Sequence, residues 1–206
     1  MSERAHPDDP GFRDCVELRK LFGFIPVRRK VPNPYREALC WRYAVVNSHC
    51  KGKRVLDIPC GMGWGTSMLE GCSVLHGVDI SSEAVEEARC RYGHRAVFNV
   101  GSMEQLEFPD RTFDLVSCLE GIEHVSEAVA LSFLGEASRV LDTHGLLILS
   151  SPYCNTAPHS GNPYHLREYR SEEMNALLET HFLVEHAMAR TVDNLTITLF
   201  HARKRD

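Results

Sequence analysis

The sequence predicts an α/β fold, namely a Rossmann-like, doubly wound, mostly parallel sheet of seven strands with an antiparallel C-terminal edge strand. Three observations support this prediction. Apolar runs typical of buried strands alternate with amphipathic helical stretches, which indicates parallel strands covered by helices on both faces. A glycine-rich turn follows the first of these runs. The last two runs have no helix between them, so we expect them to pair as an antiparallel hairpin.

The expected elements follow one another along most of the chain. Residues 35–49 predict a helix, because apolar side chains recur there at helical spacing and Pro34 suits a first helical turn. The other expected elements, in order, are a strand at 54–58, a helix at 64–70, a strand at 73–80, a helix at 81–92, strands at 96–100 and 113–119, a helix at 126–141, a strand at 146–151, a proline-rich loop at 152–163, a helix at 171–182, and strands at 183–192 and 195–204.

Length and composition bound the domain organisation. The chain has 206 residues, of which 43% are hydrophobic and 25% are charged, and this fits one globular domain. We predict an N-terminal extension or lid at residues 1–33 and the α/β domain at residues 34–206. The loop at 152–163 is also long enough to cover a substrate.

Charge and hydropathy count against several classes of partner. The formal net charge of −5 gives no electrostatic reason to expect nucleic acid. No apolar run reaches the roughly 18 residues that cross a bilayer, and the N-terminus lacks the apolar core of a signal peptide. We therefore expect a cytoplasmic protein without a membrane partner. The sequence pattern indicates no particular oligomeric state.

Glycines crowd the turn after the first strand of the expected domain. Gly61, Gly63 and Gly65 stand at alternate positions. Without Cβ atoms, they let a ligand approach the main chain, and free amides there favour a carboxylate or a phosphate. A tight turn between packed elements is the alternative interpretation. Dinucleotide-binding turns normally follow G-x-G-x-x-G, whereas this one follows G-x-G-x-G, which disfavours a dehydrogenase.

Two acidic residues flank this turn. Asp57 ends the first strand, where a carboxylate disfavours a phosphate and suits an ammonium group. Asp79 ends the second strand, where a carboxylate can accept hydrogen bonds from both hydroxyls of a ribose. Together they indicate a ligand with an amino-acid end and a nucleoside end.

Four motifs occur in an order that resembles class I S-adenosylmethionine-dependent methyltransferases. They are VLDIPCGMGWG, GVDIS, FDLVSCLEGIEHV and GLLILSSP. The resemblance covers roughly residues 34–206 and implies S-adenosylmethionine as the cofactor. It also implies that Asp57 and the glycine turn hold the methionine part, that Asp79 holds the ribose hydroxyls, and that Ile80 packs on the adenine.

The resemblance implies further cofactor contacts after the third and fourth strands. Ser102 and Met103 would contact the adenine edge, and Leu119 or Glu120 would line the far side. The chain also departs from the family pattern, because Ser102 stands where the family often has Asp.

Two residues within the turn need their own interpretation. Pro59 stands where the family usually has Gly, and it removes one amide while leaving the later glycines in place. Trp64 suits a packing role, and it can also contact the cofactor from inside the turn.

Acidic and histidine side chains gather after the fourth strand. Glu120, Glu123 and His124 follow it directly, and His165 lies near the same rim. On a short helical piece, Glu120 and Glu123 would share a face. Carboxylate and imidazole ligands suit Mg²⁺, Mn²⁺, Fe²⁺ or Zn²⁺.

Three interpretations of this set stay open. Glu120 lines the cofactor pocket while the histidines pack or bond locally; or all four side chains bind a divalent metal; or His124 or His165 acts as a metal-free general base. Under the last two interpretations, we predict Glu123, His124 and His165 as the catalytic residues.

The E-x-x-E-H pattern and later His resemble the metal site of small-RNA 3′-terminal 2′-O-methyltransferases, and a similar stretch occurs in ubiquinone-biosynthesis O-methyltransferases. The segment NPYHLREYRSEEMNALLETHF resembles more closely a bacterial group associated with sugar, glycan and natural-product pathways. We predict methyl transfer to a hydroxyl of a small molecule or sugar with vicinal hydroxyls, with or without a divalent metal. The alternatives are an RNA 3′-terminal 2′-O-methyltransferase and a non-catalytic S-adenosylmethionine-binding protein.

Overall fold

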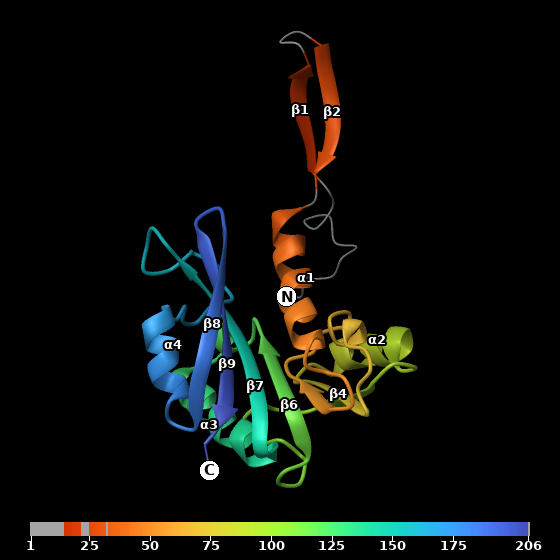
Figure 1. Ribbon diagram of the computed structural model, residues 1–206, viewed down its shortest axis with the longest axis vertical. Helices are drawn as coiled ribbons and strands as arrows, with labels where there is room; N and C mark the ends of the chain where they lie inside the picture. Colours follow the sequence, from red (N-terminus) through yellow and green to blue (C-terminus); the bar gives the residue numbers. More distant parts are fainter. Residues whose placement is uncertain (1–14, 22–24, 32, 206) are drawn as a thin grey trace.

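A seven-stranded sheet forms the centre of the molecule, with the strand order β5-β4-β3-β6-β7-β9-β8 (Figure 1). Its strands are β3 (Arg54–Asp57), β4 (Val74–Asp79), β5 (Val97–Val100), β6 (Phe113–Leu119), β7 (Leu141–Cys154), β8 (Phe182–Val192) and β9 (Leu195–Lys204). Strands β3 to β7 pair in parallel, and β9 pairs antiparallel with both β7 and β8. The predicted fold class is confirmed. In one detail the sheet differs, because the antiparallel strand β9 lies inside it and β8 forms the edge.

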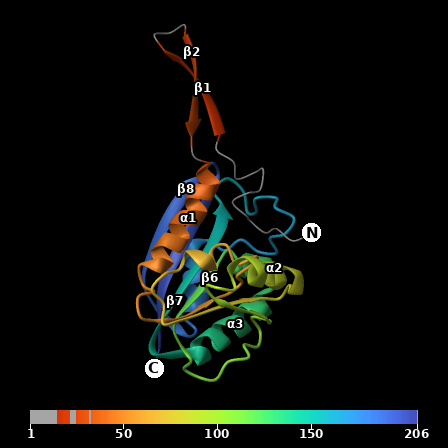
Figure 2. The ribbon, with the colours of Figure 1, turned by 90° about the vertical axis from the view of Figure 1, so that its right-hand side faces the viewer.

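The computed structural model describes residues 15–21, 25–31 and 33–205, with side chains from residue 33 onward. Strands β1 (Cys15–Leu21) and β2 (Ile25–Val31) pair antiparallel in a sheet of their own. This hairpin, which we did not expect from the sequence, extends away from the large sheet (Figures 1 and 2). The role of residues 1–33 as a lid stays a prediction, and part of that segment lies outside the described residues.

Helices cover both faces of the large sheet. They are α1 (Pro34–Asn47), α2 (Ser82–Tyr92), α3 (Glu127–Val140) and α4 (Ser171–Leu178). Helices α1 and α2 contribute to one buried cluster together with Leu115, whereas α3 and α4 contribute to the other together with Val116. Successive side chains of a strand point to opposite faces, so a continuous apolar run such as β6 supplies both clusters.

Three helices begin at side-chain caps that their sequences supply. Asn33 accepts hydrogen bonds from the amides of Tyr35 and Arg36 at the start of α1. Ser81 and Ser126 cap α2 and α3 in the same way. These caps satisfy amides that have no partner within the helix.

Three predicted elements have different bounds in the structure. The helix expected at 64–70 is only a 3₁₀ turn, η2 (Thr66–Met68), because Leu69 is already extended, with a φ of −80° and a ψ of 116°. The helix expected at 171–182 ends at Leu178, since Phe182 is buried as the first residue of β8. Strand β7 continues to Cys154 because β9 pairs with it over that whole length, so the loop begins only there.

Candidate active site

The glycine turn lies at the carboxyl end of β3, where the strand order reverses between β3 and β6. Gly61 has a φ of +53° and Gly63 a φ of +78°, a region that favours glycine. A Cβ atom on Gly63 would lie 2.8 Å from Ala88 Cβ and 2.8 Å from the Phe98 ring, whereas one on Gly61 would meet no atom within 4 Å. Gly63 therefore serves packing, and the backbone at Gly61 faces open space in which a ligand can lie.

Asp79 joins the end of β4 to this turn. Its carboxylate accepts hydrogen bonds from the amides of Gly61 and Ser81, each at 2.9 Å. The next residue, Ile80, is 75% exposed, which leaves an apolar side chain beside the acid. An acidic acceptor next to an exposed apolar side chain fits a ribose followed by a flat base.

Asp57 lies behind the turn and is fully buried. Its carboxylate accepts hydrogen bonds from Ser117 Oγ and Thr66 Oγ1, each at 2.6 Å, and from the Tyr43 hydroxyl at 3.3 Å. Burial raises the pKa of Asp57 to about 6, although the three hydrogen bonds oppose this change. Asp57 thus holds β3, β6, η2 and α1 together. Its contact with the methionine part of a cofactor stays a prediction.

The Pro59 ring has room in the turn because Gly121, in the segment after β6, has no side chain. A Cβ atom on Gly121 would lie 2.3 Å from Pro59 Cδ, so the proline ring packs directly on that glycine. The contact joins the segment after β3 to the segment after β6. Trp64 is half-buried and stands edge-on to Tyr43, with 6.4 Å between the ring centroids.

The other predicted cofactor residues lie after β5, at the end of β6 and just beyond it. Ser102 Oγ accepts a hydrogen bond from the Glu104 amide, and Met103 packs partly buried against the core. Leu119 is buried at the end of β6. The next residue, Glu120, has a φ of +51°.

Arg42 is a charged residue of this site that the sequence analysis did not single out. It is 5% exposed, and its Nε and Nη1 atoms have no hydrogen-bond partner. Nη1 lies 3.7 Å from Oε2 of Glu120, whereas the other carboxylate oxygen, Oε1, accepts a hydrogen bond from Ser150 Oγ. Buried donors without partners are costly, so this guanidinium is suited to a negatively charged ligand group. One feature of the sequence could have indicated its role, because Arg42 is a charged residue on the otherwise apolar, buried face of α1.

Glu123, His124 and His165 come together beyond the end of β6. One ligand atom from each lies within 4.8 Å of the others, and Glu123 is fully buried. The short 3₁₀ turn η3 (Ile122–His124) carries two of them. The Glu123 carbonyl accepts hydrogen bonds from the amides of Leu166 and Arg167, and these bonds hold the His165 loop against η3.

Glu120 does not join this group. It precedes η3 with a positive φ, and its carboxylate contacts Ser150 and Arg42 instead, so the helical piece that would put Glu120 and Glu123 on one face does not form. The structure therefore brings three of the four predicted metal ligands together.

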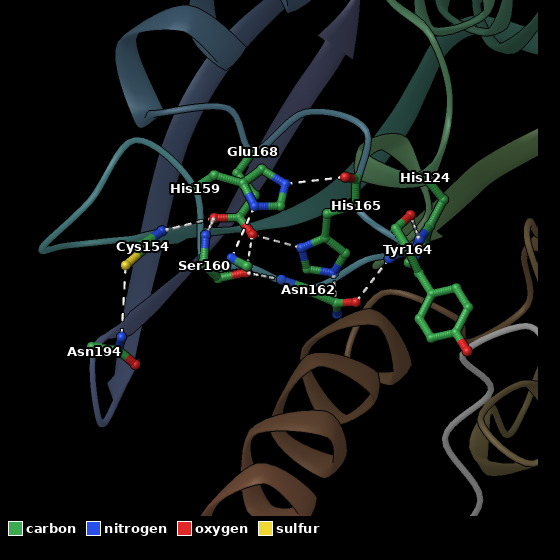
Figure 3. Close-up of polar contacts among 10 residues, drawn as sticks. His124, Cys154, His159, Ser160, Asn162, Tyr164, His165, Glu168 and Asn194 are labelled. Atoms are coloured by element: carbon green, nitrogen blue, oxygen red, sulfur yellow. Dashed lines mark hydrogen bonds and ion pairs between the residues drawn. The ribbon is translucent and has the colours of Figure 1, made fainter.

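Both histidines of the group have a polar partner on Nδ1 (Figure 3). Nδ1 of His124 lies 2.9 Å from the Tyr164 carbonyl oxygen, and Nδ1 of His165 lies 2.7 Å from Glu168 Oε1. Burial acts to raise the pKa of Glu168, but hydrogen bonds from Ser160 and His165 outweigh it and hold that pKa below its usual value.

These features define a Rossmann-like α/β protein in which a glycine turn and an acidic residue meet at the carboxyl ends of β3 and β4. Residues 55–145 match the family model described as a methyltransferase domain. A probable S-adenosylmethionine-dependent methyltransferase of Mycolicibacterium smegmatis is 32% identical over 143 residues, which cover 67% of this chain and 54% of that protein. A ubiquinone biosynthesis O-methyltransferase of Neisseria meningitidis serogroup C is 35% identical over 91 residues, which cover 39% of this chain and 37% of that protein.

A solved structure has the same fold. The 1,6-didemethyltoxoflavin-N1-methyltransferase of Burkholderia thailandensis superposes with a TM-score of 0.71 at 21% identity, covering 82% of this chain and 79% of that one. Together, the matches place the chain among the class I S-adenosylmethionine-dependent methyltransferases, as the motifs predicted. S-adenosylmethionine is the cofactor of that family.

The chain spans about half the length of the first curated relatives that it matches. Within the part that the structure describes, no helix combines the length and the apolar character that crossing a membrane requires.

Proposed function

We propose that this domain methylates a hydroxyl group of a small molecule or sugar that carries a neighbouring hydroxyl, with a divalent metal bound by Glu123, His124 and His165. The main support is the approach of these three side chains to one another within 4.8 Å, on the segment that follows β6. Strand β6 pairs with β3, which leads into the glycine turn. The ubiquinone biosynthesis O-methyltransferases among the matched proteins are consistent with an oxygen acceptor.

The cofactor supplies an already activated methyl group, so the protein mainly has to align it with the acceptor. Open backbone at Gly61 would receive the methionine part, and Arg42 would bind its carboxylate. Asp79 would accept hydrogen bonds from the ribose, and Ile80 would pack on the adenine. Such alignment can lower a barrier by roughly 7–11 kcal/mol. The walls of the cofactor pocket would be completed by the remaining predicted residues, namely Pro59, Trp64, Ser102, Met103 and Leu119.

The ligand set favours some metals over others. With Glu120 outside the group, two imidazoles and one carboxylate remain. This combination suits Mn²⁺, Fe²⁺ or Zn²⁺ better than Mg²⁺, which prefers oxygen ligands. Three protein ligands leave open positions for two neighbouring hydroxyls of the acceptor. A metal bound there would stabilise the alkoxide that attacks the methyl group.

Measuring S-adenosylhomocysteine release tests this proposal directly. The acceptor panel contains catechols, sugars and a short RNA with a free 3′ end. We expect turnover of a diol, loss of turnover with a chelator, and recovery with Mn²⁺, Fe²⁺ or Zn²⁺. Turnover of the RNA alone would contradict a small-molecule acceptor. Full turnover in the chelator would contradict metal assistance and leave His124 as the base.

Glu123→Gln separates catalysis from cofactor binding. The change removes the negative charge from the three proposed metal ligands. We therefore expect kcat to fall by at least about 100-fold, which is typical for loss of a side chain that assists proton removal. The S-adenosylmethionine Kd, measured by calorimetry, should stay within about twofold, since Glu123 lies outside the cofactor turn. Glu172→Gln, the same change at an exposed residue of α4, is the control. Equal kcat values for the two variants would refute the role of Glu123.

Arg42→Gln tests the cofactor assignment. The loss of a charged hydrogen-bond donor costs about 1.5–3 kcal/mol, so we expect S-adenosylmethionine to bind about 10–100-fold more weakly by calorimetry. Decarboxylated S-adenosylmethionine should bind both proteins alike, because it lacks the carboxylate. An unchanged Kd for the intact cofactor would exclude Arg42 as its partner.

A further inference from the structure

Glu168 lies in the loop between β7 and α4, and its side chain is fully buried. Oε2 accepts hydrogen bonds from the amides of Cys154 and Ser160, each at 3.1 Å. Oε1 accepts hydrogen bonds from Ser160 Oγ and from His165 Nδ1, the latter at 2.7 Å (Figure 3). One carboxylate thus connects the end of β7, the middle of the loop and an imidazole of the active site.

These contacts fix the position of the hydrogen on His165. A carboxylate accepts hydrogen bonds, so Nδ1 of His165 carries the hydrogen. The other ring nitrogen, Nε2, lies 3.0 Å from Nδ2 of Asn162, an amide donor, which is consistent with a lone pair on Nε2. Both neighbours therefore select the same tautomer.

The neighbouring histidines His124 and His159 have different tautomers, each set by its own hydrogen-bond partners. Nδ1 of His124 faces the Tyr164 carbonyl, so His124 also has its lone pair on Nε2. Nε2 of His159 faces the His165 carbonyl oxygen at 3.0 Å, and its Nδ1 accepts a hydrogen bond from the Gly161 amide at 2.9 Å. His159 is therefore the opposite tautomer with both nitrogens engaged. The two histidines next to Glu123 thus share one tautomer, in which Nε2 of His165 faces Asn162, and His159, which serves the loop, has the other.

From this arrangement we propose that Glu168 is a positioning residue that holds His165 as the Nδ1–H tautomer and fixes its ring beside Glu123 and His124. A carboxylate behind a histidine orients the ring and makes the opposite nitrogen more basic, for a metal or for a proton. The effect on methyl transfer rests on the proposed function, whereas the tautomer does not.

Glu168→Gln tests this role, since glutamine keeps the size of the side chain but has an amide that can donate to Nδ1. In the native protein, long-range ¹H–¹⁵N spectra of the imidazoles should show His165 with the hydrogen on Nδ1. In the variant, we expect the Nε2–H form to appear. Mn²⁺ affinity, followed by electron paramagnetic resonance, should fall by about 10–100-fold, and kcat should fall similarly. KM for S-adenosylmethionine should stay within about twofold.

Glu172→Gln is the control and should change none of these readouts. An Nε2–H tautomer in the native protein would overturn the proposal without any variant, as would an unchanged tautomer and Mn²⁺ affinity in Glu168→Gln. A tautomer change in a protein that methylates no acceptor would support the role of Glu168 and refute the proposed function instead.

Discussion

The domain contains two histidine clusters that differ in their polar partners. One lies beyond the ends of β6 and β7, and the other lies between the end of α1 and strands β8 and β9. The first, which we call the loop cluster, consists of His124, His159 and His165. The second, which we call the edge cluster, consists of His49, His186 and His201.

In the loop cluster, oxygen acceptors hold the rings of His124 and His165 through Nδ1. In the edge cluster, His201 is 2% exposed and its Nε2 has no hydrogen-bond partner. Its ring stacks on His186 at 4.1 Å between centroids and meets His49 edge-on at 5.1 Å. Among the described residues, the only group of side chains close enough to share a metal ion combines His124 and His165 of the loop cluster with Glu123. Histidines that an acceptor orients can serve chemistry, whereas stacked histidines serve packing.

The largest difference between the clusters should appear in catalysis. We expect His124→Asn to lower kcat for methyl transfer by about 10²–10⁴-fold, because it removes a metal ligand or base. The matched change His186→Asn, at an exposed position of the edge cluster, should leave kcat within about twofold. Rates of S-adenosylhomocysteine formation at saturating cofactor measure both. A comparable loss in His186→Asn would remove the functional distinction between the clusters.

A second difference should appear in stability against pH. Burial, followed by the neighbouring His186 and His49, lowers the pKa of His201 to about 4. An unfolded histidine has a pKa of about 6.5, so the unfolded chain binds more protons between these values. The contribution of the neutral His201 ring to folding stability is therefore complete above about pH 6.5 and is lost as the pH falls toward 4. Glu185 and Arg203, which also act on His201, oppose each other in sign.

His201→Phe should remove this dependence, since phenylalanine keeps a ring in the stack and does not titrate. Between pH 7 and pH 4.5, the free energy of unfolding of the native protein should fall by about 2 kcal/mol more than that of the variant. This is less than the full pKa shift of His201 would give, because solvent screens the exposed His49 and His186. Urea unfolding at several pH values measures this. Parallel pH profiles would show that His201 titrates alike in both states.

The sequence predicted the parts of this molecule that depend on local patterns. Apolar periodicity and the motif order predicted the order of strands and helices, the glycine turn, and the position of Asp79 at the end of a strand. The 3₁₀ turn at Thr66 did not follow, because the chain is extended at Leu69 and the Glu70 amide bonds instead to Asn47 of α1, a distant partner. The helical piece on which the two glutamates would share a face also did not form, since η3 begins only at Ile122 and Glu120 has a positive φ.

Residues whose role depends on distant partners were not predicted. Glu168 lies only three positions after His165, yet its importance requires the amides of Cys154 and Ser160, which the fold brings to it. Arg42 faces Glu120 from a helix 78 positions earlier in the chain. Spacing alone could not reveal either contact, although a charged residue inside an apolar face is a usable signal.

The smallest expected effect concerns α1, which connects the two regions. Tyr43 donates a hydrogen bond to Asp57 behind the cofactor turn, and His49, just beyond the end of α1, meets the edge cluster. Tyr43→Phe should cost about 1 kcal/mol of stability, because Thr66 and Ser117 still donate to Asp57. Tyr164→Phe, at a partly exposed ring, is the control and should change stability by less than about 0.5 kcal/mol.

The pH dependence of Tyr43→Phe should run opposite to that of His201. The folded pKa of Asp57, about 6, lies above its unfolded value of about 3.9, so its contribution is present at low pH and lost as the pH rises through that interval. Loss of one donor to the carboxylate raises the folded pKa further, so the cost of Tyr43→Phe should be larger at pH 7 than at pH 4.5. Urea unfolding at both pH values measures it. An equal cost at both would show that the hydroxyl does not stabilise the Asp57 charge.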